Sequence, residues 1–246
     1  MLKTKQEIKY WLAKHEIINY IINDDLTVDV YEDVFLSKNT PNFLVQFGTI
    51  EGDFDCSNIE LTSLKGCPKI IKGNFSCSDN PLSSLKYGPI EVEKNFSCSN
   101  TDITNLKFSP KKVGNNFSCS FCKLTSFLGC LKKINGNFSC SYNQLTSFKY
   151  LPESINGNFI ATANKFNSFK FFPKNISGFI YLEQNLLIKD MLVDFDCTFN
   201  DIRCDFASKK REFLLALHVF EVIKQEKNIL NIFLNQNNKK ELKKRL

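Results

Sequence analysis

The sequence predicts an α/β repeat fold, a solenoid in which a 21-residue unit recurs and each unit adds a short strand to a parallel sheet. Three residues that recur every 21 positions support this prediction: a phenylalanine, a cysteine two residues later, and an apolar residue five positions after the cysteine. Self-similarity at a period of about 20–50 residues is the signature of stacked repeat proteins. The three series are Phe54, Phe75, Phe96, Phe117, Phe138 and Phe159; Cys56, Cys77, Cys98, Cys119 and Cys140; and Leu61, Leu82, Ile103, Leu124, Leu145 and Phe166.

The cysteine series is interpreted as core filler. Alternate residues of a strand face opposite sides, so Phe75 and Cys77 point inward while Ser76 points outward. Strands paired in register about 4.8 Å apart stack the five cysteines in one column. Cysteine behaves as a small hydrophobe, and Ala161 and Leu182, which neither bind metal nor oxidise, continue the column.

Disulfides and metal sites are the alternatives for these thiols. Stacked side chains run parallel, whereas a disulfide needs converging Cβ atoms about 3.8 Å apart. Cys119 and Cys122 form a C-x-x-C motif, but no second motif or histidine pair completes a zinc site. Cys122 stands where Asn80 and Asn143 stand, at a turn whose backbone groups need hydrogen-bond partners. We expect no disulfide, metal or cofactor, and the many thiols without a signal peptide favour a cytoplasmic protein.

The order of residues within the repeat indicates a family. Phe75, Cys77, Asn80 and Leu82 follow a pattern of alternating apolar residues, then Asn or Cys, then Leu. With the stretches LTSLKGCP and GNFSCS, the chain resembles leucine-rich repeat proteins of the phage, giant-virus and bacterial type. The resemblance covers most of the chain and implies a solenoid with one short strand per repeat on its concave side and an irregular convex side. It brings no catalytic residues, and it departs from the family where Ile71 precedes the strand by four residues instead of three.

Both ends of a solenoid expose core unless something covers them, so capping segments are expected. We divide the chain into an N-terminal helix and hairpin cap (1–33), a leucine-rich repeat solenoid (34–206) and a C-terminal helical cap with a basic tail (207–246). The C-terminal helices have wide apolar faces, which fit either a lid over the last repeat or a surface for a partner or second copy. From Lys209 onward lie ten basic and four acidic residues, so this segment carries the whole net charge of +6.

The N-terminal cap has its own signals. Thr4 and Glu7 have the spacing of a capping box, and the helix after them carries an apolar stripe that includes Trp11. We expect Trp11 to pack on the first repeat instead of binding a ligand. The alternating apolar residues from Leu26 to Val30 predict a strand or hairpin leading into the array.

Two exposed columns of the predicted sheet change character toward the C-terminal half. One column holds Asp and Ser until Ile160 and Tyr181, and the adjacent column holds Asn and Asp until Phe121 and Tyr142. Exposed aromatic residues on a polar sheet are typical of protein interfaces. We predict that these four residues form one contiguous patch that binds a protein partner. The alternative is that they rest against the C-terminal helices.

A column of lysines lies off the strands. Stacked lysines could follow a polyanion such as nucleic acid or an anionic membrane, and Lys243, Lys244 and Arg245 of the tail could bind it through counterion release. The alternative is a solvated edge that discourages aggregation, because the array as a whole is neutral. The column consists of Lys65, Lys86, Lys107, Lys149 and Lys170.

The sequence favours a binding protein over an enzyme. It has no nucleophile motif, phosphate-binding loop or metal cluster, and its two histidines lie outside the repeats. We therefore expect a non-enzymatic scaffold for protein–protein recognition, and the resemblance implies a viral or bacterial protein that binds a host factor. Polyanion binding is the alternative. No stretch has the length and apolarity of a transmembrane helix, and no oligomeric state is specified.

Overall fold

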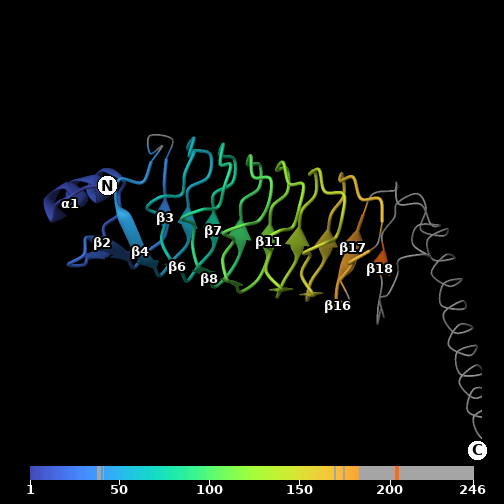
Figure 1. Ribbon diagram of the computed structural model, residues 1–246. Helices are drawn as coiled ribbons and strands as arrows, with labels where there is room; N and C mark the ends of the chain where they lie inside the picture. Colours follow the sequence, from blue (N-terminus) through green and yellow to red (C-terminus); the bar gives the residue numbers. More distant parts are fainter. Residues whose placement is uncertain (38–39, 41, 169, 174, 183–202, 205–246) are drawn as a thin grey trace, which may run out of the picture.

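The chain forms a parallel-strand β-solenoid of about seven turns with few helices, so its described residues form a β fold where an α/β repeat was expected. The computed structural model describes residues 1–37, 40, 42–168, 170–173, 175–182 and 203–204. Figure 1 shows the turns stacked side by side along one direction, with the helix α1 (Lys5–Lys14) at the end where the chain begins. In this part of the chain, no helix combines the length and apolarity needed to cross a membrane.

The recurring phenylalanines form the first row of strands, as predicted. These strands are β3 (Val34–Phe35), β5 (Phe54–Asp55), β7 (Phe75–Ser76), β9 (Phe96–Ser97), β11 (Phe117–Ser118), β13 (Phe138–Ser139), β15 (Phe159–Ile160), β17 (Phe179–Tyr181) and β18 (Arg203–Cys204). They make one parallel sheet in the order β18-β17-β15-β13-β11-β9-β7-β5-β3. Phe75 pairs with Phe54 on one side and Phe96 on the other, so the in-register stacking of repeats is confirmed.

A second row of strands corrects the expectation of one strand per repeat. It comprises β1 (Tyr20–Ile22), β2 (Thr27–Val30), β4 (Gln46–Ile50), β6 (Ile70–Ile71), β8 (Glu91–Val92) and β10 (Lys112–Val113) in one sheet, and β12 (Lys133–Ile134), β14 (Ser154–Ile155) and β16 (Asn175–Ile176) in another. Ile71 is buried and recurs at the repeat period as Val92. The four-residue step from Ile71 to Phe75 leaves room for a bend between two strands. The remainder of the turn, residues 58–69 in the first full repeat, contains no strand.

The core is a single cluster that runs the length of the described array. The ring centroids of successive phenylalanines from Phe54 to Phe159 lie 4.8 to 6.2 Å apart. Aromatic pairs at this separation contribute about 0.5–1.5 kcal/mol beyond the area they bury. The phenylalanine column therefore stabilises each interface between neighbouring turns.

The cysteine column from Cys56 to Cys140 is buried as predicted, and its five cysteines are free thiols. The thiols also donate hydrogen bonds to the next turn: Cys56 Sγ lies 3.2 Å from the carbonyl oxygen of Ser76, and Cys119 Sγ lies 3.5 Å from that of Ser139. Burial raises the pKa of the column thiols well above the usual value, so they stay protonated and can act as donors. Cysteine thus supplies a weak donor as well as the right volume.

The burial of this column predicts its reactivity. In the native protein at pH 8, we expect iodoacetamide to modify Cys56, Cys77, Cys98, Cys119 and Cys140 at least about a hundred-fold more slowly than in the urea-unfolded chain, because the array must open first. Peptide mass spectrometry over time measures each rate. Hydrogen bonds from Cys98 and Thr101 lower the pKa of Cys122 to about 7, so this thiol is the internal comparison and should react first among the buried ones. Rapid modification of the five in the native state would contradict their placement.

Buried asparagines bond the backbone where the chain leaves three of the phenylalanine strands, β7, β13 and β15, as expected. The side chain of Asn80 accepts hydrogen bonds from the amides of Ile59 and Leu61 in the preceding turn. Its Nδ2 donates to three carbonyl oxygens. Asn143 makes the equivalent donations, to the carbonyl oxygens of Cys119 in the preceding turn and of Cys140 and Ser141 in its own turn. Cys122 takes the place of this asparagine, since its thiol lies 3.3 and 3.5 Å from two of the equivalent carbonyls.

The N-terminal segment follows its sequence signals. The capping box of Thr4 and Glu7 begins α1, and Trp11 is buried with its ring centroid 6.0 Å from that of Phe47. Strands β1 and β2 form the expected antiparallel hairpin. Strand β2 then pairs in parallel with β4, so the hairpin continues the second row of strands. The predicted C-terminal helical cap, residues 207–246, lies outside the described residues.

Candidate functional site

Each turn of the solenoid has an exposed corner directly after its phenylalanine strand, where one residue adopts a positive φ. The residues at this corner are Asn58, Asp79, Asn100, Phe121, Tyr142 and Ala163, with φ between 53° and 58°. Asn and Asp tolerate this left-handed conformation, whereas it is unfavourable for bulky side chains. The aromatic residues at two of the corners are therefore not explained by backbone preference.

Phe121 and Tyr142 form a stacked pair on the surface. Their ring centroids lie 4.3 Å apart with an interplanar angle of 8°, and the two residues are 56% and 55% exposed. More than half of each side chain therefore remains open to solvent. The structure brings these two predicted residues together as a flat aromatic platform.

The other two residues of the predicted patch lie on the strands. Ile160 and Tyr181 are register partners in β15 and β17, and both are half-buried. The four residues thus form two pairs, one at the corners and one on the sheet. The corner pair presents the larger exposed area.

The predicted lysine column occupies a second corner, about eight residues further along each turn. All five lysines are exposed. In the turn that contains Lys86, the amide of Gly88 donates to the carbonyl of Leu85 at 3.0 Å, and Ser84 Oγ accepts from the amide of Lys86 at 3.1 Å. The five ion pairs among the described residues involve other lysines. Lys243, Lys244 and Arg245 lie outside the described residues.

The residue after each lysine was missed by the sequence analysis. This residue is Gly66, Tyr87, Phe108, Tyr150 or Phe171, and Gly129 holds the same position after Leu128, which interrupts the lysine column; all six have a positive φ. The four aromatic residues are 46–59% exposed. Lys86 Nζ lies 4.9 Å from the ring centroid of Tyr87, and Lys149 and Lys170 lie similarly over Tyr150 and Phe171. The repeated Lys-aromatic dipeptide was the signal that could have revealed this arrangement.

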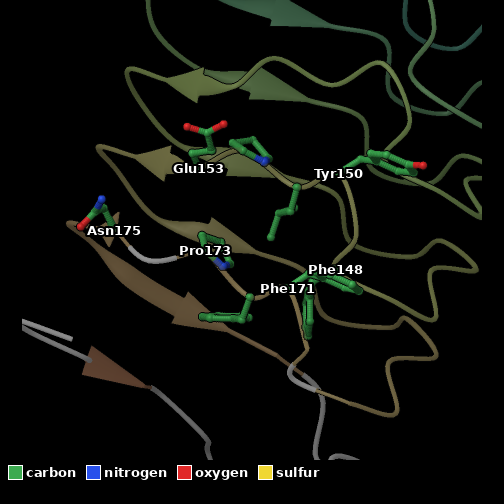
Figure 2. Close-up of a pocket in the computed structure, with 9 residues that line it drawn as sticks. Phe148, Tyr150, Glu153, Phe171, Pro173 and Asn175 are labelled. Carbon is green, nitrogen blue, oxygen red and sulfur yellow. The ribbon is translucent and has the colours of Figure 1, made fainter. Parts of the chain in front are cut away.

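A hollow of about 510 Å³ adjoins the C-terminal end of this second corner (Figure 2). Figure 2 shows Phe148, Tyr150 and Phe171 on one side of it and Glu153 and Asn175 on the other. Glu153 forms an ion pair with Lys132 at 3.8 Å. The hollow therefore has aromatic walls and one carboxylate whose charge is paired.

The described residues also include potential metal ligands and a histidine. No three of their His, Cys, Asp or Glu side chains gather as a metal site. His15 is half-buried beside Trp11, and its Nδ1 lies 3.2 Å from Thr40 Oγ1, so its surroundings are those of a packing residue. Comparison of the chain with protein-family models, curated proteins and solved structures found no match.

Proposed function

We propose that this protein is a non-enzymatic recognition scaffold that binds a protein partner through the stacked pair of Phe121 and Tyr142. The single observation that carries the proposal is this pair: two large rings, more than half exposed, at backbone positions that favour Asn or Asp. Aromatic side chains are enriched among residues that dominate binding energy. Ile160 and Tyr181 extend the surface along the neighbouring strands.

The rigidity of the solenoid supports a role in recognition. Serine side chains around the pair are bonded to one another across turns, as in Ser99 with Ser118 and Ser120 with Ser139, each at 2.8 Å. A platform held by such a network loses little conformational freedom when a partner binds, which favours affinity. The array is pre-organised and the rings are its most exposed apolar feature in this region.

We also propose that the repeats are of the leucine-rich type. The buried Asn80 serves the backbone at the end of its strand, and the apolar residues around it occupy the positions of the family pattern. The second row of strands is this chain's own variation on that pattern.

Exchange of the two rings for asparagine tests the proposed function. Asn58 and Asn100 show that asparagine suits the same corner, so the variant Phe121→Asn with Tyr142→Asn should fold with a free energy of unfolding equal to wild type or higher by up to about 1 kcal/mol. In affinity capture from the native cell, followed by calorimetry with the purified partner, we expect affinity to fall by about thirty-fold or more.

The matched control changes two exposed aromatics at the other corner, Tyr87→Gly with Phe108→Gly. This control should retain the partner at wild-type affinity. Equal recovery of partners by wild type and by the asparagine variant would show that the pair does not bind them.

A further inference from the structure

We infer that the second corner binds a single-stranded nucleic acid. The binding surface is the Lys-aromatic ladder, defined as Lys86 with Tyr87, Lys107 with Phe108, Lys149 with Tyr150, and Lys170 with Phe171. Its lysines contact phosphates, and its rings stack on bases. This surface is separate from the Phe121 and Tyr142 pair, and it binds a nucleic acid where the pair binds a protein.

The first step is the backbone at the ring positions. A hydrogen bond from the fourth residue to the first, with a positive φ at the third residue, is the pattern of a type II turn, which favours Gly or Asn at that residue. Gly66 and Gly129 meet this preference, whereas Tyr87 has φ 72° and Phe108 has φ 67°. The left-handed conformation costs a non-glycine residue about 1–2 kcal/mol. Four of six turns carry this cost.

The second step is that burial does not offset the cost. Phe108 is 59% exposed and Phe171 is 56% exposed, while neighbouring Leu106 and Phe148 are fully buried. The residues two positions before three of the rings, Leu85, Leu106 and Phe148, are all buried. Rings kept outside at a strained position are therefore available to a ligand with flat faces.

The third step is charge. The ladder lysines form none of the ion pairs found among the described residues. Three of them lie over the ring of the next residue, at 4.9 to 5.5 Å from its centroid. Such exposed contacts contribute only about 0.5–1 kcal/mol, so a lysine can turn to a phosphate while a base occupies the ring face. The positive charge thus lies beside each stacking surface.

The fourth step is spacing. Successive turns lie about 4.8 Å apart, so the four rungs from Tyr87 to Phe171 span about 19 Å. Gly129 divides the ladder into two pairs of rings. The hollow of about 510 Å³ lies against Tyr150 and Phe171, where an unstacked base can enter. A short run of nucleotides fits this length.

A single strand satisfies these features better than other polyanions. The bases of a duplex are stacked on each other and cannot reach the rings, whereas single strands expose them to aromatic side chains. Sulfated or phosphorylated polymers without bases leave the rings unused. Protein interfaces are depleted in lysine, which disfavours an alternating row of lysines and aromatics as a protein contact.

Fluorescence anisotropy with a labelled 12-nucleotide oligo(dT) and the full-length protein tests the inference. We expect binding that weakens with salt, with a logarithmic slope of about −3 from four lysines. A duplex of equal length should bind at least about ten-fold more weakly, because its bases cannot stack on the rings. The basic tail is present throughout, so differences between variants report on the ladder.

The variant that removes all four rings replaces them with glycine, the residue that this position already holds at Gly66 and Gly129. The variant Tyr87→Gly, Phe108→Gly, Tyr150→Gly and Phe171→Gly keeps every lysine, and we expect its affinity for oligo(dT) to fall by about ten-fold or more. Its salt slope should stay near that of wild type. Replacing the four lysines with glutamine should instead reduce the slope by about 0.7 for each lysine.

The asparagine variant at Phe121 and Tyr142 is the matched control and should bind oligo(dT) as wild type does. Urea unfolding of the glycine variant checks that it is folded. No measurable binding of oligo(dT) at low salt, or equal binding by wild type and the glycine variant, overturns the inference. Equal affinity for heparin and oligo(dT), unchanged by removal of the rings, shows charge attraction alone and also overturns it. Capture of a protein partner that only the ladder variants lose would assign this corner to a protein instead.

Discussion

Replacing Asn80 by alanine is expected to lower the free energy of unfolding by about 4 kcal/mol. Asn80 is only 3% exposed, and its Oδ1 is the acceptor for the amides of Ile59 and Leu61. Alanine leaves both amides buried without that acceptor, and each buried unsatisfied group costs about 1–3 kcal/mol. The carbonyl oxygens that Nδ2 serves lose a donor as well. Urea unfolding followed by circular dichroism measures the change.

The preceding turn offers a matched control in Asn58. This residue is exposed, and its φ of 54° suits glycine as well as asparagine. The variant Asn58→Gly should therefore stay within about 0.5 kcal/mol of wild type. A loss of less than about 1 kcal/mol in Asn80→Ala would mean that water replaces the side chain, and the asparagine would not be essential to the turn.

The first row of strands was predictable because buried and exposed positions alternate along it and are filled by different types of residue. Phe75 and Cys77 differ sharply from the serine between them, so alternation is visible within three residues. The second row was missed because its two-residue strands, such as β6 and β8, bury only one apolar side chain each, Ile71 in β6, so no alternation of buried residues is visible. The only sequence signal for the second row was the recurrence of Ile71 as Val92. Whether such a residue belongs to a strand depends on pairing between turns, which is a tertiary effect.

The asparagines that directly precede the first-row strands form a row of hydrogen bonds from turn to turn, and the sequence did not reveal this bonding. The amide and Nδ2 of Asn95 both donate to Asn74 Oδ1, and the amide of Asn116 donates to Asn95 Oδ1 at 3.1 Å. Each link joins residues 21 positions apart, so it exists only once the turns are stacked. The recurrence of the asparagine was visible, but its bonding partner was not.

The candidate sites were predictable to different degrees. Phe121 and Tyr142 stood out because their column is otherwise Asn and Asp, and the change of residue type is itself the signal. Tyr87 and its equivalents did not stand out, because aromatic residues are frequent in this chain and many of those in the described repeats are buried. The positive φ at this corner, shared with Gly66, distinguishes them from core residues, and that is a property of the turn.

Replacing Phe138 by alanine is expected to lower the free energy of unfolding by about 3–5 kcal/mol. The ring is fully buried, and its centroid lies 5.6 Å from that of Phe117 and 5.9 Å from those of Phe127 and Phe159. The cavity cannot collapse, because β13 is paired in register with β11 on one side and β15 on the other. The cost should therefore lie in the upper part of the range found for buried aromatics. The exposed Phe108 provides the comparison, since Phe108→Gly should stay within about 1 kcal/mol of wild type.

The architecture predicts how such losses combine. Each turn contacts mainly its neighbours, so damage to one interface is not transmitted to distant ones. Phe54 lies four turns from Phe138, and the loss in Phe54→Ala with Phe138→Ala should equal the two single losses added together, within about 0.5 kcal/mol. Phe138→Ala with Phe159→Ala should fall short of additivity by more than this, because the two rings are in contact and their cavities merge. Additivity in both double variants would contradict the stacked column, because rings that contact each other cannot contribute independently.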